Sequence, residues 1–153
     1  MQRDATTATV SNQERAEMRE IVSFVGHKLI RAEHKTTIEI TKEDFLTSRG
    51  DCIIGVNSSK SASELDERLK KYIREGREIN FTLYVEGERY CFNARGGRNL
   101  TMSSRVSIVI RKSRFVDERT VAVMSEAAAS DIPRKIIDKL RAGGKGEIVI
   151  EVH

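Results

Sequence analysis

Tryptophan is absent from the chain, and the sequence contains only one proline and two cysteines. The two cysteines, Cys52 and Cys91, are too few for the disulfide framework of a small secreted domain, and neither belongs to a C-x-x-C pair. A chain of 153 residues buries roughly two thirds of its unfolded surface, so it folds without crosslinks or a structural metal. We therefore expect both thiols to be reduced.

Long hydrophobic runs are also lacking. None approaches the roughly 20 apolar residues that a membrane helix needs, and the N-terminal segment has no apolar core of a signal peptide. We therefore expect a cytoplasmic protein without membrane contact. Residues 1–17 are polar and show no periodicity, which predicts a mobile N-terminal tail, and we expect a single folded domain over 18–153.

Signatures of common catalytic and nucleotide-binding families are missing. The sequence has no G-x-S-x-G, H-E-x-x-H, zinc-finger or kinase motif, and its glycines form neither a P-loop nor a dinucleotide fingerprint. Aromatic residues make up 5% of the chain, which is few for a platform that stacks single-stranded nucleic acid. The sequence therefore identifies no cofactor and leaves open whether the protein is an enzyme.

Charge is what the sequence has in abundance. Lys and Arg number 27 against 23 Asp and Glu, so the net charge is +4 and the pI is about 9.2. Charged residues make up 33% and hydrophobic residues 39%, a balance typical of a globular domain with a charged surface. The basic excess mildly favours an anionic partner, either nucleic acid or a phosphorylated small molecule.

Hydrophobic periodicity predicts eight strands and two helices. Ser61 and Glu64 have capping-box spacing, which predicts the start of the first helix, and Gly76 suits its end. The predicted strands cover residues 20–26, 35–42, 52–56, 78–85, 88–94, 105–112, 120–124 and 147–152.

The second helix ends near Arg141, but its start has two alternatives. It begins at Ser125 and kinks at Pro133, or it begins near Asp131 with Pro133 in its first turn.

The second half of the chain repeats the first. A shift of 70 residues places Ile38 on Ile108, a shift of 67 aligns the two helices, and a shift of 69 aligns the last strand of each half. The two repeat units, 18–86 and 88–153, each have the order β-β-β-α-β.

This duplication predicts a mainly β fold of the α+β class. Two pseudo-twofold-related units are expected to bury one face of each sheet, forming a β-sandwich or flattened barrel with the helices at its ends or outside. The alternative is one continuous mixed sheet with both helices on one face.

The repeat also sorts the candidate catalytic residues. Under the 70-residue shift, Cys52 falls on Ala122 and Cys91 on Ile21, which predicts core positions for both thiols. His27 and His34 fall on residues that are not histidine, so the repeated architecture does not require them and they can have a functional role. With Asp51 they form a candidate catalytic or His/His/Asp metal group, although their spacing is not that of a metal motif, and we predict no metal.

The segment 94–99 is the main candidate for anion binding. Arg95 and Arg98 offer bidentate donors, and Gly96 and Gly97 allow backbone N–H groups to approach an anion. A tight turn between strands explains the two glycines equally well.

Further basic candidates lie near the ends of equivalent strands. The 70-residue shift pairs Arg49 with Arg119 and Lys42 with Lys112, and Arg111 stands beside Lys112. These side chains either contact an anion or cap carbonyls and pair with carboxylates.

The segments GHKLIRAEHKTTIEITK, LTSRGDCIIGV and VIRKSRFVDERT resemble an archaeal family catalogued as a domain of unknown function. The resemblance covers roughly residues 20–152 and implies a small, mainly β fold. It implies no activity or site residue. The family's second loop tends to carry Gly-His, whereas this chain has Gly96-Gly97.

Three functions follow from these observations. The first is a binding module for an anionic partner, with binding that weakens steeply in salt. The second is a small enzyme in which a histidine acts as general base and Arg49 holds an anionic group of the substrate. The third is a structural or assembly protein that offers its sheet edges to partners.

Overall fold

The computed structural model describes residues 16, 18–46 and 50–153, and the predicted tail lies outside the described residues except for Ala16. Within these residues, eight strands, two α-helices and two 3₁₀ turns follow in the same order in each half. The mainly β, α+β fold predicted from the sequence is confirmed. The elements are β1 (Met18–Val25), β2 (Thr37–Thr41), β3 (Ile53–Gly55), η1 (Ala62–Glu64), α2 (Glu67–Arg74), β4 (Glu78–Val85), β5 (Glu88–Arg95), β6 (Ser107–Arg111), β7 (Thr120–Ala122), η2 (Ala129–Asp131), α3 (Arg134–Arg141) and β8 (Lys145–Val152).

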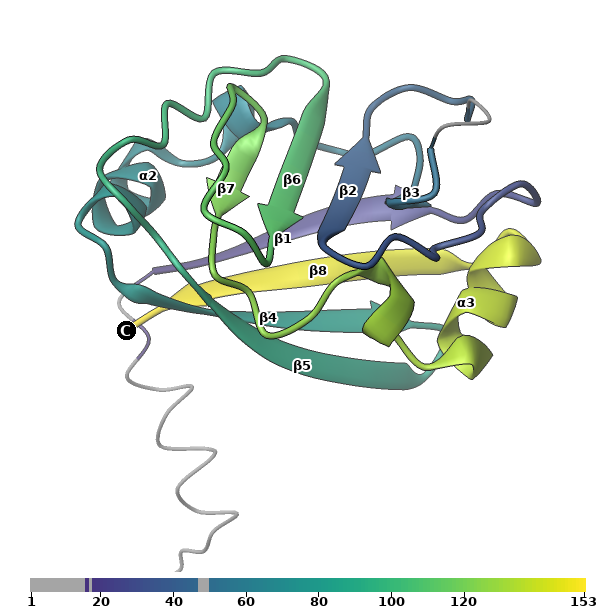
Figure 1. The fold of residues 1–153 in the computed structure, drawn as a ribbon. Helices are drawn as coiled ribbons and strands as arrows, with labels where there is room; N and C mark the ends of the chain where they lie inside the picture. The colour runs from purple at the N-terminus through teal and green to yellow at the C-terminus, as the bar shows by residue number, and fades with distance from the viewer. Residues whose placement is uncertain (1–15, 17, 47–49) are drawn as a thin grey trace, which may run out of the picture.

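The strands form two four-stranded sheets packed as a sandwich, with the two helices at opposite ends (Figure 1). Sheet A has the order β1-β8-β4-β5 and is antiparallel throughout. Sheet B has the order β3-β2-β6-β7, with an antiparallel central pair and parallel outer pairs. Single bridges, Val25 to Val56 and Arg95 to Val123, join the sheets at two corners without closing a barrel. The alternative of one continuous sheet is therefore wrong.

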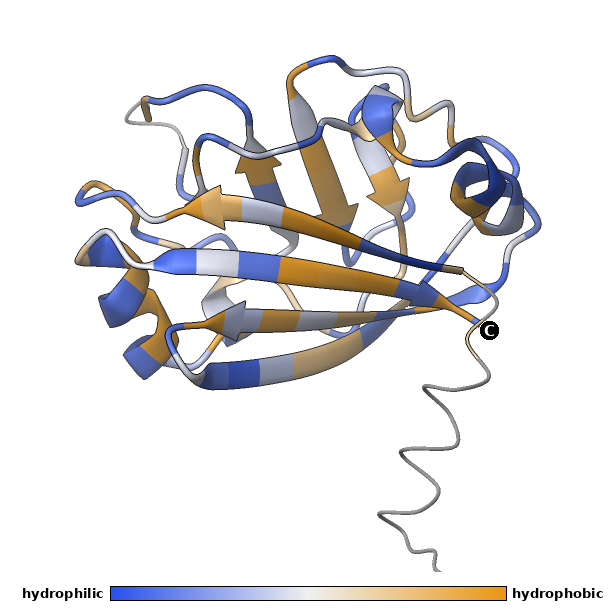
Figure 2. Ribbon diagram, turned by 180° about the vertical axis from the view of Figure 1, so that it is seen from behind, coloured by the Kyte–Doolittle hydropathy of each residue, from blue (hydrophilic) through white to orange (hydrophobic). Residues whose placement is uncertain are grey.

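Alternating side chains place the core between the two sheets. Ile38, Ile40, Ile108 and Ile110 of sheet B are at most 1% exposed. They face the inner row of sheet A, where Phe81 is fully buried. Seen from behind, the strands carry long apolar segments, whereas α2 is mostly hydrophilic (Figure 2). Within the described part of the chain, no helix combines the length and hydropathy needed to cross a membrane.

The register of sheet A relates the two halves. Met18 of β1 and Glu88 of β5 are equivalent under the 70-residue shift. Met18 pairs with Val152 of β8, and Glu88 pairs with Val85 of β4. Val85 and Val152 are therefore equivalent, and the last strands of the two halves are related by a shift of 67 residues. The predicted shift of 69 for these strands is wrong by two. A two-residue slip keeps every side chain on the same face of a strand, so the hydrophobic pattern could not detect it.

A pseudo-twofold axis follows from the same registers. In the centre of sheet B, Glu39 pairs with its own counterpart Val109, and in the centre of sheet A, Thr82 pairs with its counterpart Val149. The axis therefore passes through the middle of both sheets. Each position in one half can be compared with its counterpart across this axis.

Both helices begin beyond the positions expected from the sequence. The Glu64 carboxylate accepts the Ser61 N–H at 2.9 Å, as the capping box predicts, but this box starts the 3₁₀ turn η1. Asp66 then caps α2, and its carboxylate accepts the Arg68 N–H at 2.8 Å. Pro133 immediately precedes α3, so both predicted starts of the second helix lie too early.

Candidate functional site

A charged network occupies the outer face of sheet B. Asp117 is its centre, because its carboxylate accepts hydrogen bonds from Arg119 Nη2 at 2.7 Å, Arg111 Nη2 at 3.0 Å and Thr120 Oγ1 at 3.1 Å. Arg111 also donates from Nε to Thr120 Oγ1 at 3.0 Å and lies over the ring of Phe115. Arg111 and Arg119 thus already have carboxylate partners, which favours a structural role for both.

The electrostatics of Asp117 agree with this role. Burial raises the pKa of the Asp117 carboxyl, but hydrogen bonds from the Arg119 side chain and backbone N–H more than offset it and hold the pKa at about 2. The same Asp117 hydrogen bond raises the pKa of Arg119. Both groups therefore stay charged at neutral pH.

Cys52 adjoins this network but is not an activated nucleophile. Its thiol donates to Glu39 Oε1 at 3.3 Å, and burial together with the Glu39 charge raises its pKa to about 12. The thiol is therefore protonated at neutral pH. Cys91 is exposed on the outer face of sheet A, so the predicted core position is wrong for Cys91, and Cys52 is only half-buried.

Arg119 is the counterpart of Cys52. The Glu39 N–H donates to the Cys52 carbonyl at 2.8 Å, as the Val109 N–H donates to the Arg119 carbonyl at 2.9 Å. The predicted repeat pairs of Cys52 with Ala122 and of Arg49 with Arg119 are therefore wrong. Arg49 itself lies outside the described residues.

Lys42 and Lys112 are equivalent, as predicted, and make equivalent ion pairs. Lys42 Nζ lies 2.8 Å from Glu64, and Lys112 Nζ lies 2.9 Å from Asp131. The Lys42 hydrogen bond, helped by Ser61, lowers the pKa of Glu64 to about 2. Both lysines thus contact the 3₁₀ turn of their own half, and each has a carboxylate partner there.

The histidines act as local caps. Nδ1 of His27 accepts the Leu29 N–H at 3.0 Å, and Nδ1 of His34 accepts the Thr36 N–H at 3.2 Å. His34 occupies the position of Ser104, whose hydroxyl accepts the corresponding N–H of the other half.

Within the described residues, no hydrogen bond joins the side chains of His27, His34 and Asp51 to one another. Asp51 contributes its backbone carbonyl, which accepts the N–H of His34. Among the residues that the structure describes, no His is hydrogen-bonded to a carboxylate, and no group of three His, Cys, Asp or Glu is placed to hold a metal ion.

The segment 95–98 lies against the carboxyl end of α2. Gly96 makes this possible, because its N–H donates to the Arg77 carbonyl at 3.0 Å and a Cβ on Gly96 would lie 1.9 Å from the Ile73 carbonyl oxygen. Gly97 has open space around it. The turn interpretation therefore explains Gly96, while no close contact requires a glycine at position 97.

Four arginines come from this loop and helix end. Arg74 donates from Nε and Nη2 to the carbonyls of residues 100 and 101 at 2.9 and 3.0 Å, and Arg77 lies over the ring of Tyr72. Arg95 and Arg98 are exposed and have no hydrogen bond or ion pair from their side chains within the described chain. We call these two residues, with Arg74 and Arg77, the arginine corner.

The other end of the molecule lacks such a corner. The counterparts of Arg95, Arg98, Arg74 and Arg77 are Val25, Lys28, Arg141 and Gly144, in that order. One arginine stands there in place of four. The arginine corner is therefore not required by the repeated architecture.

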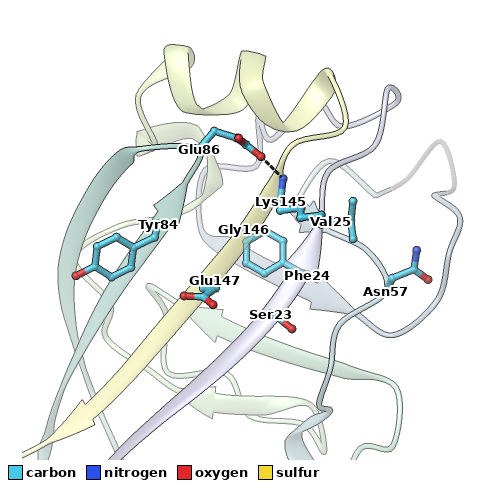
Figure 3. A pocket seen from close by; sticks show the side chains of 9 residues that line it. All are labelled: Ser23, Phe24, Val25, Asn57, Tyr84, Glu86, Lys145, Gly146 and Glu147. Carbon is cyan, nitrogen blue, oxygen red and sulfur yellow. Dashed lines mark hydrogen bonds between the residues drawn. The ribbon is translucent and has the colours of Figure 1, made fainter.

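A hollow of about 400 Å³ lies at the other end of sheet A (Figure 3). It was not predicted, because its lining comes from β1, β4, β8 and two loops that only the fold brings together. One sequence signal existed, since Gly146 has a bulky counterpart, Ile79. The lining consists of Ser23, Phe24, Val25, Asn57, Tyr84, Glu86, Lys145, Gly146 and Glu147.

Comparison with known proteins agrees with the resemblance seen in the sequence. A family model described as "Domain of unknown function (DUF371)" matches residues 22–153. An uncharacterized protein of Methanocaldococcus jannaschii is 39% identical over 123 residues, which cover 80% of this chain and 91% of that protein.

Proposed function

This chain belongs to the family described as a domain of unknown function (DUF371), and from its structure we propose that it is a binding module for an anionic partner. The contact surface is the arginine corner. The partner carries phosphate groups, as a nucleic-acid backbone or a phosphorylated small molecule does, and meets the protein in the cytoplasm.

One observation carries the proposal: among the described residues, Arg95 and Arg98 have no carboxylate partner, whereas Arg111, Lys112 and Arg119 each have one. A guanidinium that is already paired has few donors left for a ligand. An exposed and unpaired guanidinium presents its full set of donors to a phosphate.

The neighbours of this pair support the same conclusion. Arg74 donates to two backbone carbonyls and adds positive charge at the end of α2, whereas Arg77 is paired with Glu75 at 2.8 Å. A Cβ at Gly97 would meet open space. Clustered arginines on one corner raise the local concentration of anions by their combined field.

The double variant Arg95→Gln/Arg98→Gln tests the proposal. Binding to a fluorescent 20-base-pair duplex and to inorganic tripolyphosphate is measured as a function of salt. We expect the variant to bind both probes at least tenfold more weakly at low salt. For the duplex, loss of two phosphate contacts should reduce the slope of log K against log salt by about 1.8.

The matched control is Lys28→Gln/Lys35→Gln, which removes the same charge from the equivalent loop of the first half. This control should keep most of the affinity. Equal losses in the two double variants, or no binding of either probe by the native chain, would refute the proposal.

A further inference from the structure

The hollow of Figure 3 is built from side chains that stand in rows across sheet A. Ser23, Glu147 and Tyr84 form one row, because both Ser23 and Tyr84 pair with Glu147. Val25 and Lys145 pair in the next row, at the end of the sheet. The hollow therefore offers a hydroxyl, a phenol, a carboxylate and an ammonium group around an apolar patch.

Lys145 and Glu147 carry opposite charges but do not pair. They lie two residues apart on one face of β8, so their Cα atoms are about 7 Å apart. Both side chains are exposed, and neither has an ion pair or hydrogen bond within the part of the chain that the structure describes.

Glu86, a second carboxylate in the hollow, makes no ion pair with the Lys145 ammonium group within the described residues. Its carboxylate accepts the backbone N–H of Lys145 at 2.9 Å (Figure 3). This hydrogen bond leaves the Lys145 side chain unpaired. The hollow thus presents one unpaired ammonium group, the unpaired Glu147 carboxylate and a Glu86 carboxylate that is held by a backbone N–H.

The pseudo-twofold axis shows that this arrangement belongs to one end only. Across the axis, Lys145 corresponds to Glu78 and Glu147 to Asn80, so the opposed charges are absent there. Gly146 is needed for the local packing, because a Cβ at this position would lie 2.6 Å from the Phe24 ring.

We infer that this hollow binds a small zwitterion of the amino-acid class. Glu147 receives the ligand's ammonium group and Lys145 its carboxylate. A free amino acid places these two groups on one carbon, so it can bridge two charged side chains whose Cα atoms are about 7 Å apart. Val25 and the half-exposed ring of Tyr84 contact its side chain. A hollow of about 400 Å³ lies within the size range of small-molecule sites.

Three probes with nearly the same carbon skeleton test the inference. L-norvaline carries both charges, butylamine only the ammonium group and pentanoate only the carboxylate. Binding to the full chain is measured from amide chemical shifts. We expect norvaline to bind at least tenfold more tightly than either other probe, with shifts centred on residues 23–25, 84–86 and 145–147.

Single-charge variants assign the two roles. Glu147→Gln should weaken norvaline and butylamine but spare pentanoate, and Lys145→Gln should weaken norvaline and pentanoate but spare butylamine. Glu78→Gln, an exposed carboxylate at the far end of the same sheet face, is the matched control and should leave all three unchanged.

Equal binding of norvaline and butylamine, or shifts outside the hollow, would overturn the inference. The result is independent of the arginine corner, because the eight residues of β4 separate the two sites by about 23 Å.

Discussion

Replacing Gly96 with alanine is expected to destabilise the fold by about 3 kcal/mol or more. The added Cβ would lie 1.9 Å from the Ile73 carbonyl oxygen and 2.7 Å from its carbon, and both are backbone atoms of α2. Neither a rotamer change nor a small shift of one side chain relieves such a clash. Urea unfolding of the purified variant measures the loss.

Gly97 and Gly26 provide a negative and a positive control for the Gly96 variant. Gly97→Ala should unfold like the native chain, because nothing lies within 4 Å of a Cβ at that position. Gly26→Ala should share the loss, because the equivalent contact places its Cβ 1.9 Å from the Leu140 carbonyl oxygen. Similar stabilities of the Gly96 and Gly97 variants would contradict the described packing of loop against helix.

Removing the centre of the charged network should also have a large effect. We expect Asp117→Ala to lower the free energy of unfolding by about 3 kcal/mol, since Arg111, 9% exposed, and Arg119 would lose their shared carboxylate. Glu118→Ala is the control, because this neighbouring carboxylate is exposed and its side chain has no hydrogen bond or ion pair in the described chain.

The effect of Asp117→Ala should depend on pH in a definite direction. Arg119 holds the pKa of Asp117 at about 2 in the folded chain, below the ordinary value of 3.8. The stabilisation is therefore complete above pH 3.8 and is lost as the pH falls towards 2. The stability difference between the native chain and the variant should shrink over this range. A constant difference from pH 6 to pH 2.5 would argue against the ionised carboxylate as its source.

The sequence predicted the order of elements because each local signal agrees with the fold. Alternating apolar residues marked the strands, and β4 begins and ends where predicted. Glu86 and Gly87, predicted as a tight turn, have φ values of 45° and 85°, as a two-residue hairpin turn requires.

The errors arose where the chain gives no local signal. The connection 112–119 between β6 and β7 is three residues shorter than the connection 42–52 between β2 and β3. The shift between halves therefore changes from 70 to 67 inside a loop, where no periodicity reveals it. This is why Arg119 was matched to Arg49 rather than to Cys52.

The sequence indicates which residue types are candidates for a site, but it does not indicate which of their side chains contact one another. Nothing in the spacing of Arg111 and Asp117 indicates that they meet, nor that Arg98 has no side-chain partner in the described part of the chain. Those facts depend on how each loop packs on the other half. The hollow at Lys145 and Glu147 likewise exists only once three strands lie side by side.

We expect the arginine corner, and not the charged network on sheet B, to receive the anionic partner. An amide chemical-shift titration with tripolyphosphate compares the two regions in one experiment. The shifts should concentrate in residues 95–101 and the last turn of α2. Shifts concentrated in residues 111–120, with the arginine corner unmoved, would contradict this expectation.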